Sequence, residues 1–169
     1  MSKAGGNTVL VLCVVVILTA NMAAQSKRAA KEQTTMQTQF LNPEGLSKPT
    51  GYTHVVIAQP GKLVYISGQI ALNAKGELVG TGDLRAQVTQ VFENLKTALA
   101  AAGGTMNDIV KLNYYVVNLK PEQLPMLREV RNSYISQEHP PASTLAGVTA
   151  LARADFMIEI EAVAVVKGN

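Results

Sequence analysis

An amphipathic pattern between Asp83 and Gly104 constrains the fold of this chain more than any other feature. Asp83 can cap a helix by accepting a hydrogen bond from its first backbone amides, and Gly103-Gly104 can end one. Between them, apolar residues recur at steps of three and four, which is the period of one helix face: Leu84, Val88, Val91, Phe92, Leu95, Leu99 and Ala102. A helix with one apolar face must bury it, so the pattern predicts a helix packed against a core.

A second helix and five short strands are predicted around the first helix. Pro121 opens the second helix, and Pro140-Pro141 forbids its continuation. The run before the first helix is interrupted by Pro60-Gly61, which suits a tight turn, so its two halves are interpreted as a hairpin. The order ββαβαββ predicts an α+β domain with both helices on one face of an antiparallel or mixed sheet. The predicted strands are 54–58, 63–67, 109–117, 142–148 and 156–166.

The last of these strands has two unlike faces. Ile158 and Ile160 point one way, whereas two carboxylates and two valines point the other way: Glu159, Glu161, Val163 and Val165. An ordinary solvent-facing side of a sheet does not mix carboxylates with valines in this manner. The pattern therefore predicts a subunit interface that leaves polar groups free for a ligand.

The first 25 residues are typical of a signal peptide. Lys3 gives a positively charged start, Thr8 to Ala20 is a 13-residue apolar stretch, and Ala23-Ala24 supplies small residues for cleavage. A permanent membrane anchor needs roughly 20 apolar residues, so the stretch is short for one, although an uncleaved anchor is the alternative. We expect cleavage, no stable membrane insertion after it, and an exported protein that is periplasmic or secreted.

Residues 26–39 are polar and are interpreted as a linker, which leaves 40–169 as one domain. Four of the 15 basic residues and one of the 12 acidic residues precede residue 40, so the domain holds 11 of each. A neutral domain is a poor binder of nucleic acid, which requires a basic face. The only cysteine, Cys13, lies in the predicted signal peptide, and the chain has two histidines. We therefore expect neither a disulfide nor a metal site.

From about residue 40 to its end, the chain resembles the YjgF/RidA family of reactive-intermediate deaminases, also called endoribonuclease L-PSP-like. Six stretches in the order and spacing of the family carry the resemblance: Asn42 to Leu46, Tyr65 to Ile70, Gln90 to Leu95, Ala101 to Gly104, Asp108 to Leu112 and Ile158 to Val163.

The resemblance implies a chorismate-mutase-like α+β fold that assembles as a homotrimer, with small-molecule clefts between subunits. It implies hydrolysis of enamines and imines, such as 2-aminoacrylate and 2-iminobutanoate, to 2-oxo acids and ammonia without a cofactor. An imine is already activated, so positioning and one carboxylate suffice for this chemistry.

Site residues carried over from the family are Glu159, Ser67, Gly68 and His54. Glu159 falls where a glutamate positions the attacking water, Ser67 and Gly68 form a cleft wall, and His54 takes an aromatic position. The family also has an arginine that pairs with the substrate carboxylate, and Ser143 stands in its place here. A serine donates one neutral hydrogen bond, whereas the arginine fork gives two charge-assisted ones.

The second helix offers a replacement for the missing arginine, and each site residue also has a structural interpretation. We hypothesise that Arg128, on the second helix, supplies the cation that the strand has lost, so that the ligand is still a small anion, most simply a carboxylate. The alternatives are a solvated helix face for Arg128, an interface carboxylate for Glu159 and ordinary packing for His54. For the whole domain, a non-catalytic binding or scavenging protein is the alternative to a deaminase. Ribonuclease activity is a third alternative, disfavoured by the neutral charge.

Overall fold

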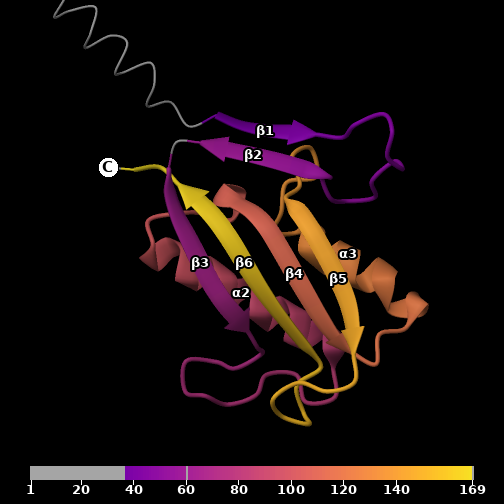
Figure 1. Cartoon of the computed structure of the whole chain (residues 1–169). Coiled ribbons are helices and arrows are strands. Elements are labelled where there is room, and N and C mark those ends of the chain that lie inside the picture. The colour runs from indigo at the N-terminus through magenta and orange to yellow at the C-terminus, as the bar shows by residue number, and fades with distance from the viewer. Residues whose placement is uncertain (1–36, 60, 169) are drawn as a thin grey trace, which may run out of the picture. The chain divides into compact units, whose positions relative to one another are not determined.

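A computed structural model describes residues 37–59 and 61–168 (Figure 1). The predicted signal peptide lies outside the described residues, as does the predicted linker up to residue 36. The described part begins with strand β1 (Gln37–Leu41), so the last three residues assigned to the linker belong to a strand. No described helix is both long enough and apolar enough to cross a membrane.

The main sheet has four strands in the order β3-β6-β4-β5. They are β3 (Lys62–Gln69), β4 (Ile109–Val117), β5 (Ala142–Val148) and β6 (Ile158–Val166). The pair β4 and β5 is parallel, whereas β6 runs antiparallel to both β3 and β4. The sheet is therefore mixed, and helices α2 (Leu84–Ala101) and α3 (Leu124–Asn132) cover one of its faces (Figure 1). The predicted α+β architecture is confirmed.

The predicted hairpin between the first two runs is wrong. Strand β2 (Val55–Gln59) pairs with β1 in a separate two-stranded sheet, and β3 pairs with β6 instead. Pairing with β6 lets β3 join the buried central sheet, a gain that a local hairpin with the half-exposed β2 would not supply. The partner of β2 was missed because β1 is a polar stretch, and backbone pairing does not require apolar side chains.

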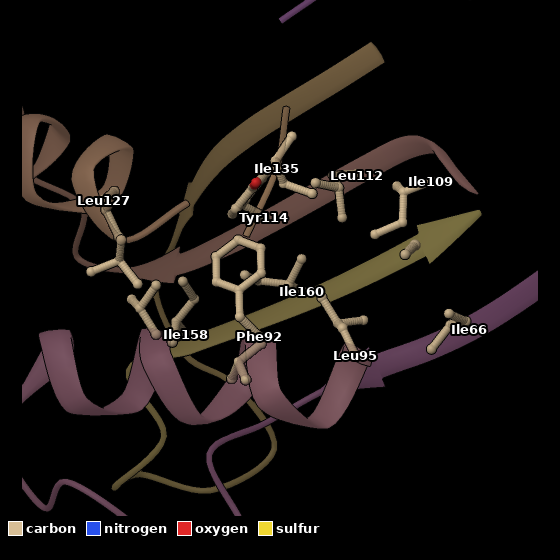
Figure 2. Packing of buried hydrophobic residues seen from close by; sticks show 14 of the residues in the cluster. Ile66, Phe92, Leu95, Ile109, Leu112, Tyr114, Leu127, Ile135, Ile158 and Ile160 are labelled. Carbon is tan, nitrogen blue, oxygen red and sulfur yellow. The ribbon is translucent and has the colours of Figure 1, made fainter. Parts of the chain in front are cut away.

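Helix α2 forms where the periodicity placed it, and its apolar face makes the core. Asp83 accepts a hydrogen bond from the Ala86 amide, which caps the helix as predicted. Figure 2 shows Phe92 and Leu95 of α2 directed at Ile158 and Ile160 of β6, and all four side chains are fully buried. The second helix begins with a 3-10 turn at Pro121–Gln123 before α3 proper.

The opposite face of the main sheet carries no helix from residues 37–59 or 61–168. Glu159, Glu161 and Val163 on this open face are half-buried, while Ile158 and Ile160 are fully buried on the helix side, which confirms the predicted alternation of β6. The neighbouring β3 leaves Tyr65 77% exposed on the same open face. A large aromatic side chain this exposed is characteristic of a surface that meets another molecule.

Candidate functional site

A cavity of about 370 Å³ lies at the edge of the sheet between β5 and α3, and we call it the β5–α3 cavity. Ser143 of β5 and Arg128 of α3 both line it, as do Arg131 of α3 and Tyr114 of β4. The segment before β2 contributes Gly51 and Tyr52. Two of the residues singled out from the sequence, Ser143 and Arg128, are thus brought to one concave site.

The register of the sheet and the pattern of α3 together position this cavity. Ser143 pairs with Leu112, whose fully buried side chain faces the helices, so Ser143 lies on the helix side of the sheet. Leu127 and Val130 anchor α3 in the core. Arg128 directly follows Leu127, so its side chain is carried at the margin of the buried stripe, facing the sheet edge.

Arg131 is half-buried and holds the segment that walls the cavity. Its guanidinium donates to the Gly51 carbonyl at 2.8 Å and to the Asn132 side-chain oxygen at 2.7 Å. Gly51 has a φ of 77°, and a Cβ there would overlap the Arg131 guanidinium, so only glycine fits this contact. Burial lowers the pKa of Arg131, the interaction with Tyr114 opposes that effect, and the nearby charge of Arg128 adds to it.

Tyr114 lines the same cavity, and its hydroxyl is buried. Its side chain is 5% exposed, and the hydroxyl has no hydrogen-bond partner among the described residues. Burial raises the pKa of Tyr114 well above its usual range, so the group is a neutral phenol at physiological pH. A buried hydroxyl without a partner is destabilising, and such groups call for an explanation in function.

A second concavity, of about 360 Å³, opens on the helix-free face of the sheet. Ser67 and Glu161 line it together with Lys111 and Asn113. One carboxylate oxygen of Glu161 accepts hydrogen bonds from the Asn113 amide at 2.7 Å and from the Tyr115 hydroxyl at 3.1 Å. The bond to Glu161 raises the pKa of Tyr115 and keeps its proton in place.

Glu159 lies against the backbone of Gly68 on this open face. A Cβ on Gly68 would overlap the Glu159 carboxylate, so the close approach requires glycine. The register between β3 and β6 shifts between Ile66 and Gln69, so Ser67 and Gly68 sit in an irregularity of the strand. Irregularities of this kind redirect side chains and are frequent beside functional sites. The predicted wall and the predicted water-positioning residue are therefore in contact.

The two halves of the predicted site nevertheless lie on opposite faces of the sheet. Glu159 pairs with Tyr115 on the open face, whereas Ser143 pairs with Leu112 on the helix face. One copy of the chain thus does not bring the carboxylate and the cavity together.

His54 is in a third place, outside both cavities. Its Nε2 lies 2.8 Å from the Ser47 carbonyl, and its ring packs edge-on against Tyr52. These contacts lie within the segment before β2, and the predicted role of His54 in ligand binding stays a prediction.

Sequence reasoning did not select Arg131, Tyr114 or the bonds of Glu161 as site features. For Arg131, the available signal was its distance of three residues from Arg128, because residues three apart share a helix face. The other two depend on which strands pair, which the sequence pattern left open. Among the described residues, no three His, Cys, Asp or Glu side chains gather where they could hold a metal ion.

Comparison with known proteins places this chain and its fold in one family. The family described as Endoribonuclease L-PSP matches residues 45–166. A RutC family protein of Pyrococcus horikoshii is 37% identical, over 72% of this chain and 92% of its own. A protein of Dermatophagoides farinae named 2-iminobutanoate/2-iminopropanoate deaminase is 33% identical, over 64% of this chain and 82% of its own.

A solved structure gives the same result. The crystal structure of YyfB, a Rid-family protein of Yersinia pestis, matches with a TM-score of 0.72 and 41% identity, over 78% of this chain and 100% of that one. The family match over residues 45–166 extends over the main sheet, both helices and the segments that wall the β5–α3 cavity. The chain belongs to the endoribonuclease L-PSP family, which includes the RidA, YjgF and RutC proteins.

Proposed function

We propose that this protein binds a small carboxylate metabolite in the β5–α3 cavity and hydrolyses an imine or enamine of that class to a 2-oxo acid and ammonia. The observation that carries the proposal is that Arg128 and Ser143 line the same cavity. A guanidinium from α3 can therefore meet a carboxylate at the position where the strand offers only a hydroxyl. The Dermatophagoides relative, which is named 2-iminobutanoate/2-iminopropanoate deaminase, supports this reaction class.

The reaction needs a base near the imine carbon, and Glu159 is the proposed base. Glu159 takes a proton from water while the water oxygen bonds to the imine carbon, and the imine nitrogen is protonated. The resulting carbinolamine expels ammonia as its hydroxyl becomes the carbonyl of the 2-oxo acid. An enamine first takes a proton on carbon and loses one from nitrogen, which converts it to the imine. No cofactor enters these steps, because the C=N bond is already electrophilic.

Assembly as a homotrimer is part of the proposal, because Glu159 and Ser143 lie on opposite faces of the sheet. A neighbouring copy that packs its open face near the β5 edge would bring its own Glu159 towards the cavity. Leu63 and Tyr65 on the open face, 52% and 77% exposed, supply apolar area for that contact. Sedimentation equilibrium of the purified chain tests this part, and a monomer at the concentrations of the activity assay contradicts it.

Export also belongs to the proposal. Residues 1–25 act as a cleaved signal, and the domain is periplasmic or secreted. Fusing residues 1–39 to a reporter that is active only outside the cytoplasm tests the location. The mass of the mature N-terminus distinguishes cleavage from an uncleaved anchor.

The second candidate function is non-catalytic binding of the same ligand, and the loss of the strand arginine at Ser143 favours it. Turnover of the substrate distinguishes a deaminase from such a binding protein. The assay follows ammonia and 2-oxo acid release from 2-aminoacrylate and 2-iminobutanoate generated in situ. The rate of product release with wild type should exceed the rate of background hydrolysis. In Glu159→Gln, the rate above background should fall to about a hundredth of the wild-type value. Lys75→Gln, in an exposed turn, is the control and should keep the full rate. Binding without turnover in wild type would establish the second function.

A further inference from the structure

The β5–α3 cavity contains two guanidinium groups and no acidic partner for either. Among the described residues that line the cavity there is no aspartate or glutamate. The nearest acid along α3 is Glu129, and Arg85 engages both of its oxygens at 2.9 and 2.8 Å. The bonds of Arg131 go to neutral groups, the Gly51 carbonyl and the Asn132 amide oxygen.

Holding two positive charges beside one cavity is unfavourable unless a negative charge offsets their repulsion. Burial is the main cause that lowers the pKa of Arg131, Tyr114 opposes it, and the charge of Arg128 makes a smaller contribution in the same direction as burial. A single carboxylate in the cavity would neutralise one of the two cations and leave the other uncompensated. Two negative charges on one ligand would neutralise both.

Arg131 retains donors for such a ligand. A guanidinium has five N–H donors. In Arg131, one N–H of each terminal nitrogen and the Nε–H are used within the chain, which leaves one donor on each terminal nitrogen. Arg128 is exposed and makes no ion pair among the described residues. The guanidinium of Arg131 is thus held in position by the chain, whereas the side chain of Arg128 can adjust its position to a ligand.

From these contacts we infer that the cavity selects a dicarboxylate over a monocarboxylate. This inference rests on the proposed function. Arg128 takes the carboxylate beside the imine carbon, and Arg131 takes a second carboxylate at the far end of the ligand. A cavity of about 370 Å³ accommodates a diacid of four or five carbons. The preferred substrate class is then the imine of an acidic 2-amino acid, and the product is a 2-oxo diacid.

The Tyr114 hydroxyl is consistent with this choice. Tyr114 lines the same cavity as Arg131, and its buried hydroxyl has no partner among the described residues. A carboxylate held by Arg131 would bring a charged acceptor towards that donor. Charge-assisted hydrogen bonds are about twice as strong as neutral ones, so the second carboxylate would gain from both groups.

The test compares two product analogues with the same number of carbons, oxaloacetate and 2-oxobutanoate, by isothermal titration calorimetry at fixed ionic strength. Wild type should bind oxaloacetate at least about tenfold more tightly, as one additional desolvated charge-assisted pair implies. Arg131→Gln should reduce the difference to less than about threefold, whereas Arg131→Lys should keep most of it because the charge remains. Lys75→Gln is the charge-matched control and should behave as wild type.

The outcomes separate this inference from the proposed function. Equal affinity of wild type for the two acids overturns the inference and leaves the proposed function standing. A preference for oxaloacetate that persists in Arg131→Gln also overturns it. Failure of wild type to bind either acid refutes the proposed function as well. Thermal unfolding of Arg131→Gln checks its folding, since Arg131 also holds Gly51, and the wild-type comparison needs no variant.

Discussion

Replacing Gly68 by alanine should separate the position of the Glu159 carboxylate from the stability of the fold. An added Cβ would overlap the carboxylate and would also lie too close to the rest of the Glu159 side chain, so that side chain must change its conformation. Because the open face leaves room for the carboxylate to swing away, the variant should lose only about 1 kcal/mol, the usual cost of a displaced rotamer.

The effect of Gly68→Ala on catalysis should be much larger. A displacement of about 1 Å in a positioning group lowers a rate about a hundredfold, and the alanine forces at least that. Ammonia release from 2-iminobutanoate measures the rate, and urea denaturation measures the free energy of unfolding. Gly45→Ala is the matched control, since a Cβ on Gly45 meets nothing within 4 Å.

A double-mutant cycle gives the stability argument its sharpest form. If the strain arises from the Glu159 carboxylate, removing it in Glu159→Ala should abolish the cost of Gly68→Ala. A stability loss of the same size in the Glu159→Ala background would refute the overlap as its cause. A Gly68→Ala variant with the wild-type rate would refute the role of this contact in positioning the carboxylate.

Three further predictions follow from buried polar groups. Gln87→Leu should lower the free energy of unfolding, measured in urea, by about 3 kcal/mol. The fully buried side-chain amide of Gln87 donates to the Gly80 and Asp155 carbonyls and accepts from the Met157 backbone amide. A loss below about 1 kcal/mol would contradict this prediction. Tyr114→Phe should leave the protein as stable or more stable by up to about 1 kcal/mol, since the hydroxyl has no partner among the described residues, and a clear loss would disprove that assignment. Burial, and then the bond to Glu93, raise the pKa of Tyr134 from 10.0 to about 12, so its contribution to stability is present below pH 10 and is lost as the pH rises through 12. Tyr134→Phe should remove part of that alkaline slope in pH-dependent unfolding, and an unchanged slope would assign it to other groups.

The elements that could be predicted from the sequence are those with a local signal. The period of α2, its cap at Asp83 and the alternation of β6 follow from residues that are close in the chain. The pairing of β3 with β6 joins residues about a hundred positions apart, and no local pattern specifies it. The turn at Pro60-Gly61 favoured a hairpin, but the burial gained at the central sheet outweighs the nearness of β2.

In the candidate site, too, the features with a local signal could be predicted and those that depend on contacts between elements could not. The resemblance placed Ser143 and Glu159 correctly on their strands, and Arg128 lies on the second helix as predicted. The side chains that complete each half could not be predicted, because their contacts cross between elements. Arg131 meets Gly51, and Asn113 meets Glu161, only once the chain has folded. The opposite faces of Ser143 and Glu159 likewise emerge only from the strand register.

The most direct test of the central claim is the affinity of wild type and Arg128→Gln for 2-oxobutanoate, with Lys75→Gln as the control. The β5–α3 cavity lacks the strand arginine, so binding of the carboxylate should depend on Arg128. Arg128→Gln should weaken binding at least about tenfold, the loss of one charge-assisted pair, while Lys75→Gln retains it. Unchanged affinity in Arg128→Gln would show that Arg128 does not hold the carboxylate and would contradict the proposed role of this residue.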